Sequence, residues 1–194
     1  MEEEYIEENY HKSPRRDRAR EFLGTLLYII IVLAAVVFFV TFVAQRTKVS
    51  GQSMYPTLED GDNLITDKIS YRFRDPERFD VIIFPYDEEE GIYYIKRIIG
   101  LPGETVQIDE DGNIYIDGEI LEEDYGYETI EYAGTASELI TLGEDEYFVL
   151  GDNRNNSLDS RYAEVGLIEG SKIQGRAWVR IYPFDSIGLI KNID

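Results

Sequence analysis

A run of 23 residues without a charged side chain, Phe22–Ala44, constrains the fold of this chain most. At about 1.5 Å per residue, a helix of that length reaches roughly 34 Å, enough to cross a hydrocarbon core of about 30 Å. A cleaved signal peptide has an apolar core of only about 7 to 15 residues, so the run favours a retained transmembrane helix. The small residues around Val43-Ala44-Gln45 are the one feature that would suit cleavage instead.

The flanks of the apolar run predict its orientation. Five basic residues precede it and two follow it: Lys12, Arg15, Arg16, Arg18 and Arg20, against Arg46 and Lys48. The positive-inside rule therefore places residues 1–21 in the cytoplasm, as a polar tail that is expected to be disordered. Residues 22–44 would form the transmembrane helix, and residues 45–194 a single extracytoplasmic domain of ordinary size.

Charge and composition exclude several classes of function. The net charge of −20 comes entirely from residues 49–194, which carry 12 basic and 32 acidic side chains. Such a domain repels nucleic acid, so we expect no nucleic-acid partner. The chain has no cysteine, which excludes disulfides, Cys-His catalysis and thiolate-rich metal sites. The acidic turn Asp109–Asn113 does not fit the helix-loop-helix calcium motif, because Ile114 stands where that motif needs glycine, and we expect no metal or cofactor.

Beyond Gln45 the pattern changes to short strands separated by turn residues, which predicts a mostly β domain with an antiparallel sheet. The candidate strands are Asn63–Ile69, Asp80–Phe84, Tyr93–Ile99, Thr105–Ile108, Asn113–Ile116, Tyr147–Leu150 and Gly175–Pro183. The turn at Asp109–Asn113 joins two alternating runs into a hairpin. The acidic stretch Glu119–Glu131 has no predicted structure, and Trp178 is expected in the core.

Ser53 lies nine residues after the apolar run, in a turn of small residues that reads Ser-Gly-Gln-Ser-Met-Tyr-Pro-Thr-Leu from Ser50 to Leu58. A serine nucleophile needs a base. The chain's single histidine, His11, precedes the apolar run and would lie across the bilayer from Ser53, so a Ser-His-Asp triad is excluded. A lysine is the remaining candidate for the base.

Lys96 sits in a strand whose alternation places Ile92, Tyr94, Lys96 and Ile98 on one face. At an ordinary pKa of about 10.4, well under 0.1% of a lysine is neutral at pH 7, so a general base would need burial that lowers its pKa by about three. An apolar wall of isoleucine and tyrosine can supply that burial. A lysine whose amine reaches solvent fits the same pattern, and the pattern by itself leaves both open.

A third polar cluster follows the apolar strand that ends at Leu150. The segment Gly151–Tyr162 is dense in residues that form turns and side-chain hydrogen bonds, and it holds Asp152, Asp159 and Arg161. Such a loop is either a solvated surface loop or a structured network that supports a site.

Four segments, in this order, resemble the conserved boxes of bacterial type I signal peptidases, in their short Gram-positive-like form: Gly51–Leu58, Arg78–Phe84, Lys96–Glu104 and Gly151–Arg161. The resemblance implies a fold of the signal peptidase/LexA-like type and a single-pass enzyme of the bacterial cell membrane. It would release exported preproteins by cutting signal peptides after an Ala-x-Ala motif. Ser53 would be the nucleophile and Lys96 its general base. Ser157 would orient the lysine, while Asp152, Asp159 and Arg161 would support the site.

The sequence departs from the family pattern at two positions. Gly51 stands where some members carry a hydroxyl donor to the oxyanion, so the oxyanion hole would rest on the Ser53 backbone N–H and a further donor. Phe79 stands where the family usually has glycine, which leaves the local turn open. We expect substrate to add as an extended strand near Asp80–Phe84, with Asp80 and Ile82 in contact, and near the segment before Ser53.

Other classes of function remain to be weighed. A penicillin-binding enzyme needs Ser-x-x-Lys, and none of the nine serines has lysine three places on. A LexA-like autoprotease usually carries a DNA-binding domain, which a tail of 21 residues cannot form. An inactive membrane-tethered binding module of the same fold is the alternative to an enzyme. The expected partners are preproteins, the lipid bilayer and the export machinery.

Overall fold

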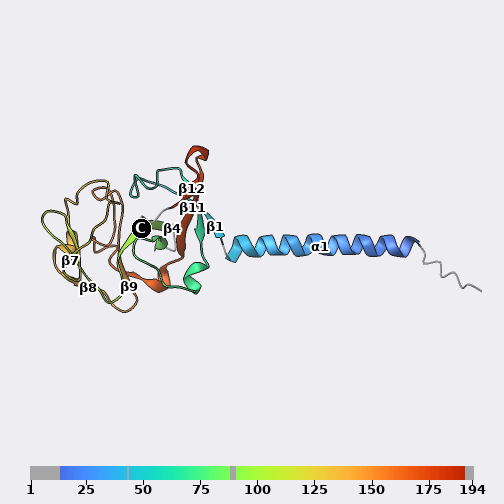
Figure 1. Ribbon diagram of the computed structural model, residues 1–194, viewed down its shortest axis with the longest axis horizontal. Helices are drawn as coiled ribbons and strands as arrows, with labels where there is room; N and C mark the ends of the chain where they lie inside the picture. Colours follow the sequence, from blue (N-terminus) through green and yellow to red (C-terminus); the bar gives the residue numbers. More distant parts are fainter. Residues whose placement is uncertain (1–13, 43, 88–90, 191–194) are drawn as a thin grey trace, which may run out of the picture. The chain divides into compact units, whose positions relative to one another are not determined.

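The computed structural model describes residues 14–42, 44–87 and 91–190 (Figure 1). The chain divides into two compact units, Met1–Thr41 and Phe42–Asp194. The first unit holds one long helix, and the second holds the strands.

The long helix α1 spans Pro14–Phe42, which is 29 residues. Its segment Arg20–Phe38 is long and apolar enough to cross a membrane. The helix begins earlier than the apolar run, so residues 14–21 are helical rather than disordered. Proline suits the first turn of a helix, because its missing N–H has no partner there in any case. Residues 1–13, which make up the rest of the predicted tail, lie outside the described residues.

The strands form two antiparallel sheets, in agreement with the predicted mostly β class. In the described residues the larger sheet has eight strands in the order β1-β2-β11-β3-β4-β9-β10, with β12 paired to β11. The smaller sheet has four strands in the order β7-β6-β5-β8. The strands are β1 (Ala44–Lys48), β2 (Asn63–Asp67), β3 (Val81–Asp87), β4 (Ile92–Gly100), β5 (Thr105–Ile108), β6 (Ile114–Ile116), β7 (Glu119–Ile120), β8 (Ile140–Thr141), β9 (Glu146–Leu150), β10 (Ile168–Glu169), β11 (Gly175–Tyr182) and β12 (Gly188–Leu189).

The predicted strands all appear, with ends shifted by up to three residues. The predicted hairpin is β5–β6, with Val106 opposite Ile116. The strands that the sequence did not predict are β1, which is highly polar, and four two-residue strands. Strands that short carry no detectable alternation, so only their pairing defines them.

Three buried apolar clusters hold the second unit together. One joins the small sheet to β9 through Val106, Ile114 and Phe148. The other two lie on opposite faces of β3, because alternate residues of a strand point to opposite sides. Ile83 belongs to the cluster with Met54 and Leu58, whereas Ile82 belongs to the cluster with Ile98 and Val149.

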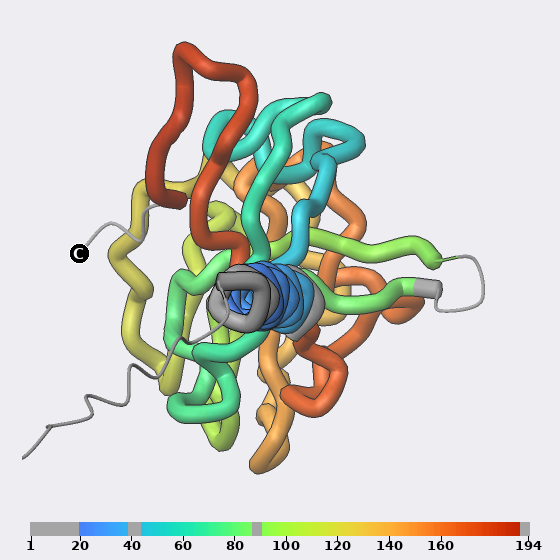
Figure 2. Tube along the Cα trace, turned by 90° about the vertical axis from the view of Figure 1, so that its right-hand side faces the viewer, coloured from blue at the N-terminus to red at the C-terminus, as the bar shows by residue number. Residues whose placement is uncertain are grey.

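Two hairpins extend from the body of the β domain (Figure 2). In the β3–β4 hairpin, β9 pairs with β4 only from Arg97 onward in the described residues. The first half of β4 therefore keeps one unpaired edge. Trp178 lies in the β11–β12 hairpin and is 44% exposed, so the prediction that it lies in the core is wrong. Both faces of this hairpin are partly exposed to solvent, which accounts for the exposure of the Trp178 side chain. The remaining short helical turns, η1 (Ser70–Arg72), η2 (Gly134–Ser137), η3 (Gly170–Lys172) and η4 (Phe184–Ser186), connect strands.

Candidate active site

Ser53 sits in a turn that is closed at its base by the main chain. Val49 N–H donates to the Asp62 carbonyl at 2.8 Å, and Gly61 N–H donates to the Val49 carbonyl at 3.1 Å. Met54 and Leu58 bury their side chains beneath the turn, at 2% and 0% exposure. The small polar residues thus stay at the surface while two apolar anchors fix the turn, and Ser53 remains half-buried.

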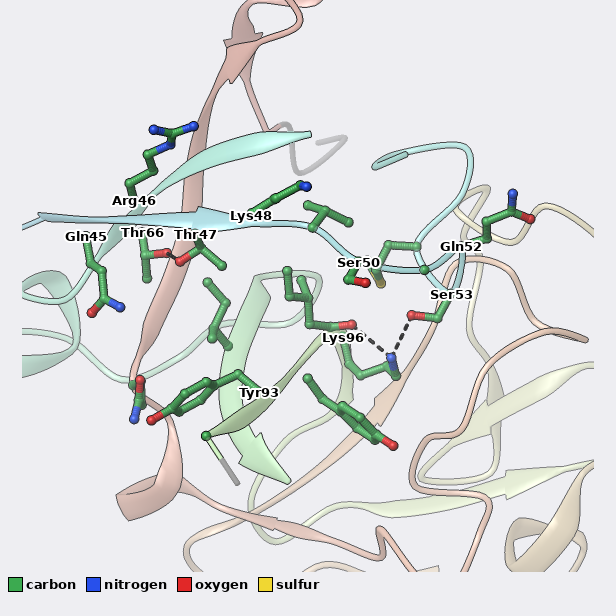
Figure 3. Close-up of a pocket in the computed structure, with 18 of the residues that line it drawn as sticks. Gln45, Arg46, Thr47, Lys48, Ser50, Gln52, Ser53, Thr66, Tyr93 and Lys96 are labelled. Carbon is green, nitrogen blue, oxygen red and sulfur yellow. Dashed lines mark hydrogen bonds between the residues drawn. The ribbon is translucent and has the colours of Figure 1, made fainter. Parts of the chain in front are cut away.

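Lys96 reaches Ser53 from strand β4, although 43 residues separate them in sequence (Figure 3). Its Nζ donates to Ser53 Oγ at 2.8 Å and to the Ile95 carbonyl at 3.0 Å. The side chain is 3% exposed, and its Nζ lies 4.9 Å from the centre of the Tyr94 ring. Of the two readings that the sequence left open, the structure has the buried lysine.

Burial lowers the pKa of Lys96 to about 8, against an opposing effect of the negative charges of Asp159 and Asp152. Removing a charged amine from water disfavours the ammonium form. At pH 7 a group with that pKa is neutral in about a tenth of molecules, compared with well under 0.1% for an ordinary lysine. Lys96 can therefore accept a proton near neutral pH.

Asp152 and Asn153 connect the turn that holds Ser53 to the loop that follows β9. Asp152 is fully buried and accepts two hydrogen bonds from Arg97, at 2.8 and 2.7 Å. Asn153 N–H donates to the Ser53 carbonyl at 3.0 Å, and its side-chain amide donates to the Gln52 carbonyl at 3.1 Å. Two consecutive residues thus link a buried ion pair to Ser53.

Asp159 and Arg161 form a second buried ion pair in the same loop. Arg161 donates to Asp159 through two nitrogens, at 2.8 and 2.9 Å, and both side chains are at most 1% exposed. Asp159 also accepts the Gly151 N–H at 3.0 Å. The loop is therefore a structured network rather than a solvated surface loop. A buried pair of this kind satisfies both charges with well-aligned hydrogen bonds.

Ser157 lies beside the site without a hydrogen bond to the lysine. It is 8% exposed, and its Oγ has no hydrogen-bond partner among the described residues. A Cβ on Gly151 would meet Ser157 Oγ at 2.2 Å and the Ser53 carbonyl at 2.5 Å, so glycine at 151 allows this close approach. The hydrogen bond that orients Lys96 is instead the one that its Nζ donates to the Ile95 carbonyl. The role of Ser157 stays a prediction.

Gly51 adopts a φ of +91°, a backbone conformation that favours glycine. Its N–H donates to Asp60 Oδ1 at 2.8 Å, so this amide is already engaged. Ser53 N–H, by contrast, donates to no acceptor within the described residues. Of these two amides, Ser53 N–H is the one that can hold an oxyanion.

Asp80 and Ile82 lie outside the pocket beside Ser53, although Ile83 of the same predicted substrate edge lines it. The contact of Asp80 and Ile82 with substrate stays a prediction. Ile82 is fully buried and pairs with both Lys96 of β4 and Arg176 of β11, so β3 has no free edge there. The Asp80 carboxylate is fully buried too. It accepts hydrogen bonds from Tyr71 at 2.9 Å and Arg74 at 3.1 Å, which gives it a structural part in the turn before β3.

A pocket of about 490 Å³ opens beside Ser53 and Lys96 (Figure 3). It is lined by Gln45–Met54, by Tyr93–Lys96 and by single residues of neighbouring elements, among them Thr66, Ile83, Leu158 and Gln174. β1 is the end strand of its sheet, and the first half of β4 keeps an unpaired edge. The pocket is thus walled by two strands with backbone groups that can still bind an extended peptide.

Arg97 and Phe79 are two residues near the site whose structural roles were not predicted from the sequence. Arg97 is fully buried and, besides Asp152, donates to the Phe79 carbonyl at 2.9 Å. Phe79 has a φ of +71°, the left-handed conformation that glycine adopts most easily. The turn is therefore kept although the usual glycine is absent. An arginine next to Lys96 in an otherwise apolar strand was the signal that could have identified the ion pair.

In the described part of the chain, no three His, Cys, Asp or Glu side chains come together as metal ligands. The chemistry available at this site is that of a serine, an amine and backbone N–H groups.

Comparison with known proteins identifies the family. The model described as Signal peptidase, peptidase S26, matches residues 22–182. A probable signal peptidase I-2 from Synechocystis sp. is 43% identical over 157 residues, which cover 77% of this chain and 68% of the relative. A signal peptidase I from Bacillus licheniformis is 36% identical, over 82% of this chain and 88% of the relative. A solved signal peptidase I from Enterococcus faecalis aligns with 53% of this chain and 97% of that chain, at 38% identity and a TM-score of 0.42. On the family match and the identities to these relatives, the chain belongs to the signal peptidase, peptidase S26, family and is a serine peptidase.

Proposed function

We propose that this chain is a membrane-anchored endopeptidase that removes signal peptides from exported preproteins after an Ala-x-Ala motif, with Ser53 as nucleophile and Lys96 as general base. One observation carries the assignment of the dyad. The amine of Lys96 is buried, has a pKa lowered to about 8 and lies 2.8 Å from Ser53 Oγ. A nucleophile and its base need that distance and a base that is neutral near the working pH.

The mechanism starts with neutral Lys96, whose N–H bond to the Ile95 carbonyl at 3.0 Å orients the amine. Lys96 takes the proton of Ser53, and Ser53 Oγ attacks the scissile carbonyl carbon. The Ser53 N–H holds the developing oxyanion. The resulting ammonium then gives its proton to the leaving amine. Lys96 next activates a water molecule, which attacks the acyl-enzyme and releases the signal peptide.

The substrate would bind as an extended strand between β1 and the first half of β4. Their unpaired edges can donate to and accept from a peptide main chain, as in other cases of strand addition. Val49, Ile83 and Ile95 supply apolar side chains to the lining of the pocket beside Ser53. A small apolar pocket of that kind favours alanine-sized side chains before the cleaved bond.

The membrane topology is part of the same proposal. The helix α1 would anchor the enzyme in the lipid bilayer, with residues 1–21 in the cytoplasm and residues 45–194 outside. The excess of basic residues before the apolar run supports that orientation. Preproteins emerge from the export machinery on the outer side, which makes that machinery an expected partner.

The test is cleavage of a purified preprotein that carries an Ala-x-Ala site, by the full chain in detergent or vesicles. The wild type should cleave after the motif, and Ser53→Ala and Lys96→Met should each lower the rate by at least about a thousandfold. Cleavage that survives Lys96→Met would contradict the dyad. A wild-type chain that binds preprotein without cleaving it would instead indicate an inactive binding module.

A further inference from the structure

The acidic stretch without a predicted structure turns out to lie along the loop 151–161 that supports Ser53. We call residues 121–132 the strap; it runs from the end of β7 towards η2. Glu123 forms an ion pair with Arg154 at 2.7 Å, with both side chains at most 8% exposed. Asn155 accepts the Glu131 N–H at 3.0 Å and donates to the Thr129 carbonyl at 2.9 Å. The strap is therefore bonded to the loop at several points rather than at one.

Tyr125 makes the most buried contact of the strap with the network. Its ring lies 3.7 Å from the guanidinium carbon of Arg97, and Tyr125 is only 6% exposed. Arg97 is the residue that binds Asp152 through two hydrogen bonds. A cation stacked on a ring without water between them is attracted by the electron-rich face of the ring. The ring therefore limits the positions that the Arg97–Asp152 pair can take.

Tyr127 provides a second connection from the strap to the nucleophile turn. Its N–H donates to the Asp152 carbonyl at 2.8 Å. Its ring packs edge-on against Tyr55, two residues after Ser53, with centroids 4.8 Å apart. The strap thus contacts the main chain of Asp152 directly and its side chain only through Arg97. The next residue, Asn153, donates to the Ser53 carbonyl at 3.0 Å.

We propose that the strap is a positioning element for catalysis: Tyr125 acts through the Arg97–Asp152 pair, and Tyr127 acts through the Asp152 carbonyl and Tyr55, to hold the main chain of Ser53 in register with Lys96. The inference rests on the proposed function of Ser53 and Lys96. None of the described strap residues lines the pocket that the substrate would occupy. Loss of the strap contacts should therefore slow the chemical step without weakening substrate binding.

The experiment measures kcat and KM for preprotein cleavage per folded molecule, with the folded fraction taken from a denaturation curve of the full chain. Tyr125→Leu should lower kcat by roughly tenfold to hundredfold, since a misplacement near 1 Å costs that much, and leave KM within about twofold. Tyr125→Phe keeps the ring over Arg97 and should restore most of kcat. The control is Ile108→Ala, which removes a fully buried side chain of the small sheet and should lower stability but not kcat.

Three results would overturn the inference: a kcat of Tyr125→Leu equal to wild type, an increase in KM alone, or a kcat of Tyr125→Phe as low as that of Tyr125→Leu. Tyr127 is 50% exposed, so Tyr127→Ala will fold even if Tyr125→Leu does not. It should lower kcat severalfold, and a wild-type kcat would equally count against the strap. Wild type and Ser53→Ala are measured in the same assay as controls. If the wild type does not cleave preprotein, the proposed function is contradicted. If the wild type cleaves and the strap variants have the same kcat, only this inference is contradicted.

Discussion

The pocket wall, which is formed by β1 and the first half of β4, and the loop 151–161 both lie next to Ser53. They differ in the kinds of backbone and side-chain groups that they contain. The wall consists of strand edges whose backbone groups lack partners and of half-buried apolar side chains. The loop holds four almost completely buried charged residues, Asp152, Arg154, Asp159 and Arg161. Asp152 pairs with Arg97 of β4, Arg154 pairs with Glu123 of the strap, and Asp159 pairs with Arg161. Substrate can complete the hydrogen bonds of the wall, whereas the charged side chains of the loop are already paired within the protein. Under the proposed function, the loop would hold Ser53 in place and the wall would select the substrate.

The largest effect on stability is expected at the loop. Asp152→Asn should lower the free energy of unfolding by about 3 to 5 kcal/mol, because the guanidinium of Arg97 would stay buried without its counter-charge. Urea denaturation of the full chain measures the change. The exposed pair Glu169–Lys172 is the matched control, and Glu169→Gln should change stability by less than about 1 kcal/mol. Equal effects at the two sites would remove the distinction between the loop and an ordinary surface.

Lys96 lies between the pocket wall and the loop 151–161. Burial of its charged amine lowers the free energy of unfolding. A pKa displaced from 10.5 to about 8 corresponds to about 3 kcal/mol of folding free energy. Below pH 8 both the folded and the unfolded chain carry the ammonium, so this cost is fully present, and it disappears as pH rises through 10.5. Lys96→Met should therefore stabilise the chain by up to about 3 kcal/mol at pH 7 and by almost nothing above pH 10.5. A gain that does not change with pH would indicate improved packing instead.

The rate of cleavage should depend on the same protonation. Below pH 8 the neutral fraction of Lys96 falls tenfold for each pH unit, so kcat between pH 7 and pH 5 should drop about a hundredfold. The measurement is a pH profile with a preprotein whose own charge does not change in that range. A flat profile would separate Lys96 from proton transfer and leave it a structural role only.

The smallest effect concerns the wall, where neighbouring residues of β3 provide a matched pair. Ile83 lines the pocket, and Ile82 points to the opposite face of the sheet. Ile83→Ala should widen the pocket and raise cleavage after larger side chains, relative to alanine, by a factor of about 10 to 200. Ile82→Ala should lose stability and keep the preference for alanine. A change of preference in Ile82→Ala would support the predicted substrate contact at that residue.

The sequence predicted the strand ends best in the hairpin where both strands alternate clearly and a turn of acidic residues and glycine joins them. Thr105–Ile108 is strand β5 with the predicted ends. β1 was missed because Gln45, Arg46 and Lys48 carry no apolar pattern, and it is a strand only because β2 pairs with it along all five residues. The predicted substrate edges were Asp80–Phe84 and the segment before Ser53, and the unpaired edge of β4 was not predicted, because local sequence does not reveal which strands of a sheet keep a free edge.

The candidate site likewise has one part that was predicted from the sequence and one part that was not. The residues of the proposed dyad were predicted from the missing cysteines, the position of His11 and the resemblance of the ordered boxes to the family. The strap did not follow from any pattern, since an acidic stretch with two tyrosines at 125 and 127 looks like a solvated loop. Its buried ring and ion pair depend on partners about 28 to 31 residues away in the chain, such as Arg97 and Arg154.

By itself, the sequence determined the apolar helix and the mostly β class, because these depend on composition and periodicity. The order of its short motifs predicted the serine and the lysine of the proposed dyad. Only the tertiary structure decided that Lys96 is buried at 2.8 Å from Ser53, that Asp80 and Ile82 lie elsewhere, and that the strap supports the loop. Burial, pKa and strand pairing are properties of groups that are distant in sequence. They arise when the sheets and loops pack together, and no local stretch of the chain carries them.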